Sequence, residues 1–339
     1  MSRRLTGVGG LAWFVILTAL VLTSMAVGSA NIAIADVIDV ILRAIGLSNP
    51  NTVTPLDRIV IELRLPRTIV AVMVGAGLGV VGCLLQTVTR NDLADPFLFG
   101  LSSGAAAGAV LVITVTGDRL GIWTLPLAAF AGGMVAALIV LGLVQRLGNQ
   151  GPEKLILAGL AVSFLFIAIT NYLIFSGDQR AAHSVLFWTL GGLGTSRWEV
   201  VPIVFLGFLA VNAFAISRHR SLDALLAGDI AADSLGVRPQ RLRQQVFLIS
   251  AFGTAIFVSV TGVIGFVGLM VPHLARAVSG TLHRGVVALS AMIGAVLLTG
   301  SDIVARVALS PQELPIGIVT SSIGAIFVFG LLLKHGRVN

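Results

Sequence analysis

The sequence predicts an all-α membrane protein that crosses the bilayer about ten times. Of its 339 residues, 56% are hydrophobic and only 11% are charged, and the mean hydropathy is +1.01. A soluble domain carries about 25% charged residues, so this chain could not cover a surface that faces water. Long runs without a charged residue recur from end to end, and about 20 apolar residues suffice for a helix to span the bilayer core. We therefore expect residues 1–339 to form a single transmembrane domain.

Nine charge-free runs supply the predicted spans: residues 5 to 35, 68 to 89, 96 to 117, 120 to 145, 155 to 177, 200 to 217, 244 to 275, 285 to 301 and 314 to 333. The run from 244 to 275 contains Gly262, Gly265, Gly268 and Pro272, which would interrupt a single helix. We divide it into a full span and a shorter one that starts near Val271, which gives ten spans. The uncharged segment 181 to 196 is too short to span and predicts a short helix at the outer interface.

The positive charges predict the orientation in the membrane. An even number of spans places both termini on the same side. If that side is the cytoplasm, 14 of the 22 lysines and arginines fall inside and 8 fall outside. Cytoplasmic loops are enriched in these residues, so we expect both termini to be cytoplasmic.

The stretch "VGAGLGVVG", residues 74 to 82, contains Gly77, Gly79 and Gly82 in the G-x-G-x-x-G spacing of a dinucleotide-binding turn. No charged residue occurs between Arg67 and Arg90, so the stretch lies within a membrane span, and we expect no cofactor there. Small residues also recur every four positions, which places them on one stripe of a helix. We predict that this stripe allows close approach of a neighbouring helix; it consists of Ala71, Gly75, Gly79 and Cys83.

The polar residues argue against several classes of membrane protein. An ion-coupled secondary transporter places ionisable residues at mid-depth in its spans, and the full-length runs contain none. The five histidines show no ligand spacing, which argues against a metalloenzyme. The chain has no G-x-x-x-x-G-K-[ST] phosphate loop. We therefore expect no catalysis, and any ATP hydrolysis would belong to another subunit.

The loop of residues 221 to 243, on the predicted cytoplasmic side, is expected to form two short helices that stop at Gly228 and Gly236. Its apolar residues suggest a surface for a partner protein. They could equally pack against the ends of neighbouring spans. These residues are Leu222, Leu225, Leu226, Ile230 and Leu235.

Five segments carry a resemblance to a known family: "RLPRTIVAVMVGAGLGVVGCLLQTVTRNDLADPFLFGLSSGAA" (64 to 106), "GDIAADSLGV" (228 to 237), "GFVGLMVPHLAR" (265 to 276), "DIVARVAL" (302 to 309) and "ELPIGIVTSSIGA" (313 to 325). With these segments in this order, the chain resembles the FecCD family of ABC-transporter permeases, which import iron-siderophore complexes, haem and cobalamin. Two positions depart from the family pattern, since Asp92 and Ile326 stand where the family usually has proline.

The resemblance implies a type II ABC importer permease in the bacterial cytoplasmic (inner) membrane, with an inverted repeat that relates spans two to five to spans seven to ten. It implies pairing with itself or with a homologue, two cytoplasmic ATPase subunits that bind ATP, and an external substrate-binding protein. Transport would proceed by alternating access. An iron-siderophore complex is the favoured substrate, with haem and cobalamin as alternatives; an ion-coupled secondary transporter is the competing function.

The resemblance also assigns roles to residues. Loop 221 to 243 would couple to the ATPases through Leu222, Leu225, Gly228, Asp229, Leu235 and Gly236. Arg64, Arg67 and Arg306 would receive carboxylates of the binding protein, and guanidinium groups suit such contacts. Arg64 and Arg67 could instead anchor helix ends at lipid headgroups. Arg306 follows Asp302 at an i, i+4 spacing, so an ion pair within one helix is its alternative role.

Overall fold

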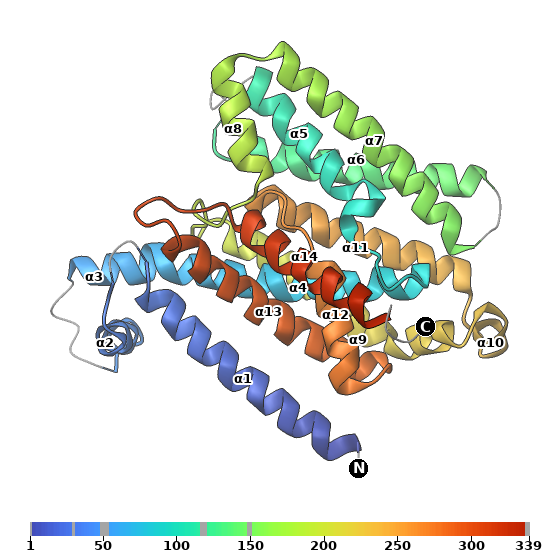
Figure 1. Ribbon diagram of the computed structural model, residues 1–339, viewed down its shortest axis with the longest axis horizontal. Helices are drawn as coiled ribbons and strands as arrows, with labels where there is room; N and C mark the ends of the chain where they lie inside the picture. The colour runs from blue at the N-terminus through green and yellow to red at the C-terminus, as the bar shows by residue number, and fades with distance from the viewer. Residues whose placement is uncertain (1, 29–30, 48–53, 116–120, 148–150, 336–339) are drawn as a thin grey trace.

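The chain folds into a bundle of helices, and the prediction of an all-α multi-pass protein is confirmed (Figure 1). The computed structural model describes residues 2–28, 31–47, 54–115, 121–147 and 151–335. Seven of the described helices are long and apolar enough to cross a membrane. Helix α1, whose apolar part is Ala12–Ala26, and the shorter helices α5 and α12 are further members of the bundle. The ten are α1 (Ser2–Ala26), α4 (Leu65–Thr89), α5 (Leu101–Val115), α6 (Thr124–Arg146), α7 (Pro152–Ser176), α9 (Val201–Leu226), α11 (Pro239–Thr261), α12 (Val267–Ser279), α13 (His283–Val307) and α14 (Ile316–His335).

Short helices lie at the two ends of this bundle. At one end are α2 (Ile34–Ala44), α3 (Pro55–Arg58) and α8 (Gln179–Thr189), and at the other is α10 (Asp229–Ser234). A π-helical turn, Ile59–Arg64, joins α3 to α4, and a 3-10 turn, Pro96–Phe99, precedes α5. We call the two ends of the bundle the Arg67 end and the Asp229 end. In Figure 1 the first turns of α1 and the last turns of α14 both lie toward the Asp229 end.

Two groups of four helices share one pattern of lengths. Helices α4 to α7 have 25, 15, 23 and 25 residues, and α11 to α14 have 23, 13, 25 and 20. Arg67 in the first turn of α4 lines the same pocket as Gly262, which follows the last turn of α11. Helices α4 and α11 therefore run in opposite directions, as an inverted repeat requires.

Helix α4 lies at the centre of the bundle, where glycines let the backbones of neighbouring helices meet. A Cβ atom on Gly75 would lie 2.3 Å from the carbonyl oxygen of Gly294 in α13, and one on Gly79 would lie 2.5 Å from that of Ser290. No side chain fits in these gaps, so the two helices pack backbone to backbone. All four residues of the small stripe are buried: Ala71, Gly75, Gly79 and Cys83.

The first span and the broken span do not have the predicted bounds. The first run, 5 to 35, is not one span, because α1 ends at Ala26 and the separate helix α2 starts at Ile34. The broken span starts at Val267 rather than near Val271. The break occurs at Gly262, whose φ of +66° ends α11 in a conformation that a glycine adopts readily. Pro272 is accommodated inside α12.

Of the two short helices predicted in loop 221 to 243, one is present as a separate helix. Helix α9 continues to Leu226, so the first predicted helix is its last turns, and only α10 is separate. No helix breaker precedes Gly228, whose φ of +110° permits the turn into α10. Leu222 and Leu225 are consequently fully buried, which confirms for these two residues the alternative that they pack against neighbouring helices. The exposed apolar residues of the loop are Leu226, Ile230 and Leu235.

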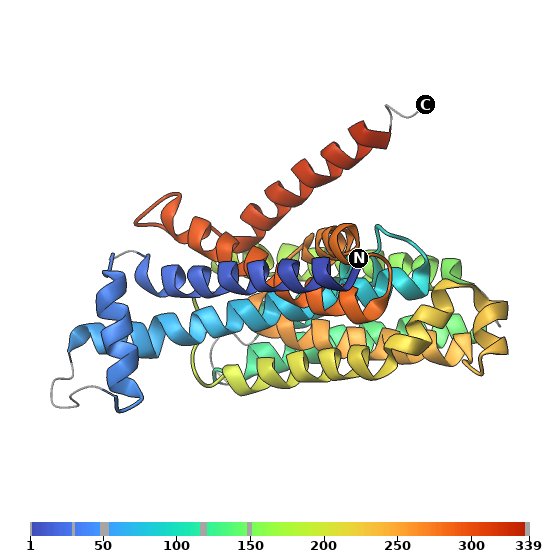
Figure 2. The ribbon, with the colours of Figure 1, turned by 90° about the horizontal axis from the view of Figure 1, so that it is seen from below.

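Helix α14 stands apart from the bundle. Figure 2 shows it rising from the Arg67 end at a steep angle to the other helices. Its middle is held by Gly324, which packs on the ring of Phe266, and by Phe327, whose ring lies 5.5 Å from that of His273. From Ile326 onward a row of large apolar side chains is exposed, formed by Ile326, Phe329, Leu332 and Leu333.

Candidate functional site

Two of the predicted docking arginines bind the end of α1. Nη1 of Arg64 donates to the carbonyl oxygens of Met25 and Ala26, at 2.7 and 2.8 Å. Nη1 of Arg306 donates to those of Ser24 and Val27, at 2.9 and 2.6 Å. The last carbonyls of a helix have no partner within it, so these guanidinium groups act as a cap from outside the helix. Both arginines are buried, with exposed fractions of 7% and 4%.

Arg67 joins three parts of the fold at the same end. Its Nη2 lies 2.8 Å from Oδ1 of Asp302 in α13, and its Nη1 donates to both carboxylate oxygens of Glu313, at 3.0 and 2.9 Å. Oδ2 of Asp302 in turn lies 3.0 Å from Nε of Arg306, so the i, i+4 ion pair is present. Asp302 therefore bridges two arginines. Because Glu313 belongs to the loop before α14, Arg67 ties that loop to α4 and α13.

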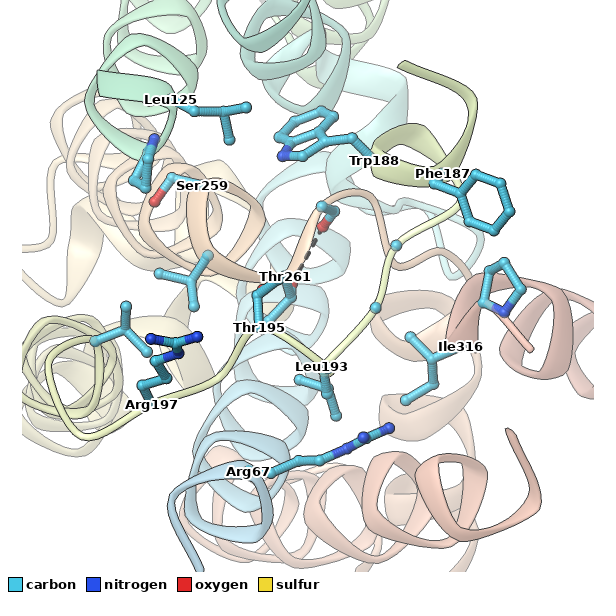
Figure 3. A pocket seen from close by; sticks show the side chains of 18 of the residues that line it. Arg67, Leu125, Phe187, Trp188, Leu193, Thr195, Arg197, Ser259, Thr261 and Ile316 are labelled. Carbon is cyan, nitrogen blue, oxygen red and sulfur yellow. Dashed lines mark hydrogen bonds between the residues drawn. The ribbon is translucent and has the colours of Figure 1, made fainter. Parts of the chain in front are cut away.

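An open pocket of about 710 Å³ lies beside this cluster, between α4, the start of α6 and the segment that follows α8. Figure 3 shows Trp188 and Phe187 on one side of it and Arg67 and Arg197 on the other. Its wall thus combines aromatic rings with guanidinium groups, and Asp302 and Glu313 contribute carboxylates. Such a mixed wall could contact a large ligand through both apolar and polar groups.

The floor of this pocket is a thin partition made of backbone. Three segments meet there: residues 188–192 at the end of α8, residues 261–263 at the end of α11, and the first turn of α14. The amides of Ile316 and Gly317 donate to the carbonyls of Gly191 and Leu190, both at 3.1 Å, and the amide of Gly192 donates to the carbonyl of Thr261 at 2.8 Å. We call these three segments the backbone partition.

Glycines make the backbone partition thin. A Cβ atom on Gly262 would lie 2.2 Å from the carbonyl oxygen of Trp188, and one on Gly317 would lie 2.3 Å from that of Leu190. A second, largely apolar cavity of about 530 Å³ lies against the same segments, lined by Thr189, Leu190, Val263 and Gly317 among others. The 710 Å³ pocket and this cavity are therefore separated by little more than one layer of chain.

Short helix α10 is held at the other end of the bundle by ion pairs. Asp229 in its first turn accepts hydrogen bonds from Nη1 and Nη2 of Arg243, at 2.9 and 2.7 Å, and pairs with Arg90 at the end of α4. The bonds from Arg243 hold the pKa of the Asp229 carboxyl below its ordinary value. The ion pairs are therefore intact at neutral pH and would be lost only as the pH falls through that lowered pKa.

Two large apolar side chains are exposed in α10 and just after it, next to a groove whose charged lining is three arginines and two aspartates. Ile230 and Leu235 are 86% and 70% exposed. The groove, of about 480 Å³, lies between α10, the start of α11 and Gly151, and Arg238 and Arg241 line it. The surface at this end thus offers two apolar side chains beside positive charge. Among the described residues, no group of three or more His, Cys, Asp or Glu could hold a metal ion.

The structure brings the three predicted docking arginines into one cluster and places the predicted coupling residues around α10. Sequence reasoning missed Glu313 and Arg243, which complete these two clusters. Glu313 is 246 residues from Arg67, and no local spacing pairs them. Their one shared signal was position, since each is a charged residue at the edge of an apolar run.

The inverted halves and the pockets at the two ends define a multi-pass membrane protein of the transporter type. The chain belongs to the FecCD transport family, whose family model matches residues 16–334. It is similar to the cobalamin import system permease protein BtuC of Halobacterium salinarum, with 40% identity over 81% of this chain and 73% of that protein. It is also similar to the Fe(3+) dicitrate transport system permease protein FecD of Escherichia coli, with 37% identity over 81% of this chain and 85% of that protein.

A solved structure shows the same fold. It is an inward-facing conformation of a metal-chelate type ABC transporter, which superimposes with a TM-score of 0.83 at 29% identity and covers 96% of this chain and 98% of the other. The prediction of a FecCD-type permease fold is confirmed.

Proposed function

We propose that the whole chain, residues 1–339, is one permease domain of an ATP-driven importer in the bacterial cytoplasmic (inner) membrane. Its favoured substrate is an iron-siderophore complex, with haem or cobalamin as alternatives. The observation that carries this proposal is the similarity, over four fifths of the chain, to permeases named for ferric dicitrate and cobalamin. The outer pocket, with its aromatic and arginine side chains, has room for part of such a large chelate.

We propose that the Arg67 end faces outward and the Asp229 end faces the cytoplasm. In this orientation 14 of the 22 lysines and arginines lie on the cytoplasmic side, and this excess supports the orientation. Cysteine tags near Arg3 and Asn339, with Cys83 replaced by alanine, should be shielded from an impermeant thiol reagent in intact cells, whereas a tag at Asp178 should react. Asn339 lies outside the described residues. Labelling of both termini from outside would contradict the orientation.

We propose that α10 is the contact with the ATPase subunits. The exposed side chains of Ile230 in α10 and of Leu235 just after it would enter a pocket on the ATPase. Gly228 and Gly236 form the turns on either side of α10. Asp229 would transmit force, because it connects α10 to Arg243 in α11 and to Arg90 next to α4. Leu222 and Leu225 would support α10 from within the bundle. ATP would be bound by the ATPase subunits alone.

The partner permease subunit would cover the exposed apolar side of α14, beyond its contacts with Phe266 and His273. An external binding protein would dock at the Arg67 end. Of the three arginines proposed to receive its carboxylates, Arg67 is the one that borders the open pocket. Arg64 and Arg306, which are largely engaged with α1, would contribute to docking mainly through their positive potential.

In alternating access, the backbone partition would be the closed outer gate of this chain. It separates the outer pocket from the inner cavity, and it is held chiefly by a few backbone hydrogen bonds. Substrate would pass when ATP-driven movement of α10 separates α14 from the segment after α8. The favourable energy lost by opening is small, since each such bond contributes only about 1 kcal/mol net.

The test is uptake of iron-loaded siderophore, haem and cobalamin, each labelled, by cells with and without this gene. Complementation should restore uptake of one of the three. Replacing the phosphate-loop lysine of the partner ATPase should abolish uptake again. Uptake that survives this replacement but stops when the proton gradient is dissipated would identify an ion-coupled secondary transporter instead.

A further inference from the structure

Within the permease alone, Arg67 already binds two carboxylates. Asp302 binds one edge of its guanidinium group, through Nε and Nη2, and Glu313 binds Nη1. The two carboxylates have very different surroundings. The Asp302 side chain is 1% exposed and also pairs with Arg306, whereas the Glu313 side chain is 44% exposed. Asp302 is therefore a fixed part of the fold, and Glu313 is the partner that solvent can replace.

A carboxylate arriving from outside would need the position that Glu313 holds. Asp302 closes the buried edge of the guanidinium group, so Nη1 is the part of Arg67 that faces the pocket. If the external carboxylate and that of Glu313 both bound Nη1, two negative charges would lie within a few ångströms of each other and repel. Binding of an external carboxylate at Arg67 thus requires that Glu313 leaves.

Departure of Glu313 would act on the start of α14. Glu313 lies three residues before Ile316, whose amide binds Gly191 in the backbone partition. Between them, Leu314 is held by a single backbone hydrogen bond, from its amide to the carbonyl of Ala305 at 2.9 Å. The Glu313 ion pair is thus one of the restraints on the segment that positions the first turn of α14.

We propose that Glu313 is a built-in competitor for the docking carboxylate of the external binding protein. The surface that fits this partner is the exposed edge of Arg67, and docking exchanges one carboxylate for another while releasing the segment before α14. This inference rests on the proposed function, because it requires docking at Arg67. It adds that Glu313 lowers docking affinity and connects docking to the backbone partition.

The test measures how tightly the purified external binding protein of this transporter binds the intact transporter, permease and ATPases together, in lipid nanodiscs. Glu313→Gln removes the charge and keeps the shape, so affinity should rise by roughly tenfold. Arg67→Gln should lower affinity. In the Arg67→Gln background, Glu313→Gln should have no further effect, because the two changes act on one contact. Glu199→Gln, another carboxylate of the same pocket, is the matched control and should change nothing.

The outcomes separate the two levels of the proposal. Unchanged affinity in Arg67→Gln would reject docking at Arg67 and with it that part of the proposed function. Weakened docking in Arg67→Gln, with no gain in Glu313→Gln, would reject the competitor alone. If Glu313→Gln is poorly folded by size-exclusion chromatography, Glu313→Ala replaces it and should show the same gain.

A second measurement needs no binding protein. A spin label at the exposed Gln312 should become more mobile in Glu313→Gln than in the parent, because the ion pair that restrains this segment is gone. The same label in Glu199→Gln should be unaffected. Unchanged mobility in Glu313→Gln would reject the connection between docking and the start of α14.

Discussion

Helices α4 and α14 are almost equally apolar but have opposite surroundings. An 18-residue stretch of the segment Pro55–Thr89, which includes α4, has a mean hydropathy of 2.4 and is 89% buried, whereas a stretch of α14 with a mean hydropathy of 2.3 is 22% buried. The difference lies in the small residues. Glycines along α4 meet the backbones of neighbouring helices, whereas in α14 such close contacts are made by Gly317 and Gly324 and end there, and a Cβ atom on Gly330 would meet nothing within 4 Å. Apolarity indicates that a helix belongs in the membrane, and its small residues indicate whether protein surrounds it.

The largest expected effect comes from replacing glycine with leucine in each helix. Gly75→Leu or Gly79→Leu should prevent folding, because the first added carbon already overlaps a carbonyl of α13; overpacking of this kind costs about 3 kcal/mol or more. Gly330→Leu in α14 should leave the yield of monodisperse protein unchanged. Fluorescence-detected size-exclusion chromatography measures both. Normal yields of the α4 variants would show that α4 and α13 do not pack as described.

A second comparison concerns two apolar residues near α10, one buried and one exposed. Leu225→Asp places a charge in a fully buried site, which costs several kcal/mol, and should abolish assembly of the permease. Ile230→Asp, at a mostly exposed site, should leave the permease folded and instead prevent its association with the ATPase subunits. Co-purification with the ATPase, compared with permease yield, separates the two results. Normal transport in Ile230→Asp would remove α10 from the proposed contact.

A third pair contrasts two arginines at the Arg67 end. Arg306→Gln should destabilise the permease by about 3 kcal/mol, because it leaves Asp302 with one partner fewer and removes the donor to the carbonyls of Ser24 and Val27 at the end of α1. Arg197→Gln, at an exposed position on the same pocket, should change stability by less than about 0.5 kcal/mol. Thermal unfolding in detergent provides the comparison. Equal melting temperatures for the two variants would contradict the cap on α1.

The smallest expected effect concerns the exposed side of α14. Phe329→Ala should weaken pairing of two permease subunits by roughly tenfold or less, because packing is the main force between helices in lipid. Phe205→Ala is the matched control, since Phe205 is also exposed and lies on α9, on the opposite side of the bundle from α14 (Figure 2). Cross-linking yields in membranes measure pairing. A larger loss in Phe205→Ala would place the partner on the α9 side.

The sequence predicted the helical class and the break after α11, because charge-free runs and clustered glycines act locally. It placed the start of α12 four residues too late, since Pro272 is tolerated in a helix whose first turns are packed by protein. It also treated Leu222 as part of a water-facing loop, although α9 carries that residue into the core. A count of uncharged residues cannot locate the end of a helix that continues through charged positions.

The candidate sites were predictable only in part, for a related reason. Arg64, Arg67 and Arg306 were identified through the resemblance, but the partners of Arg67 across the fold were not. Arg67 and Asp302 are 235 residues apart, and their contact depends on how α4 and α13 pack. No periodicity encodes such a pairing. The backbone partition was equally hidden, because it is built from main-chain groups that every sequence carries.

The cap on α1 has a consequence for biosynthesis. Arg306 follows Ser24 by 282 residues, so the first helix to leave the ribosome must wait for nearly the whole chain to be translated before its last donor arrives. Until then Arg64 is the one capping arginine that has been made. The earliest segment inserted is therefore among the last to be fixed, and a nascent chain interrupted before α13 leaves α1 incompletely held in the bilayer.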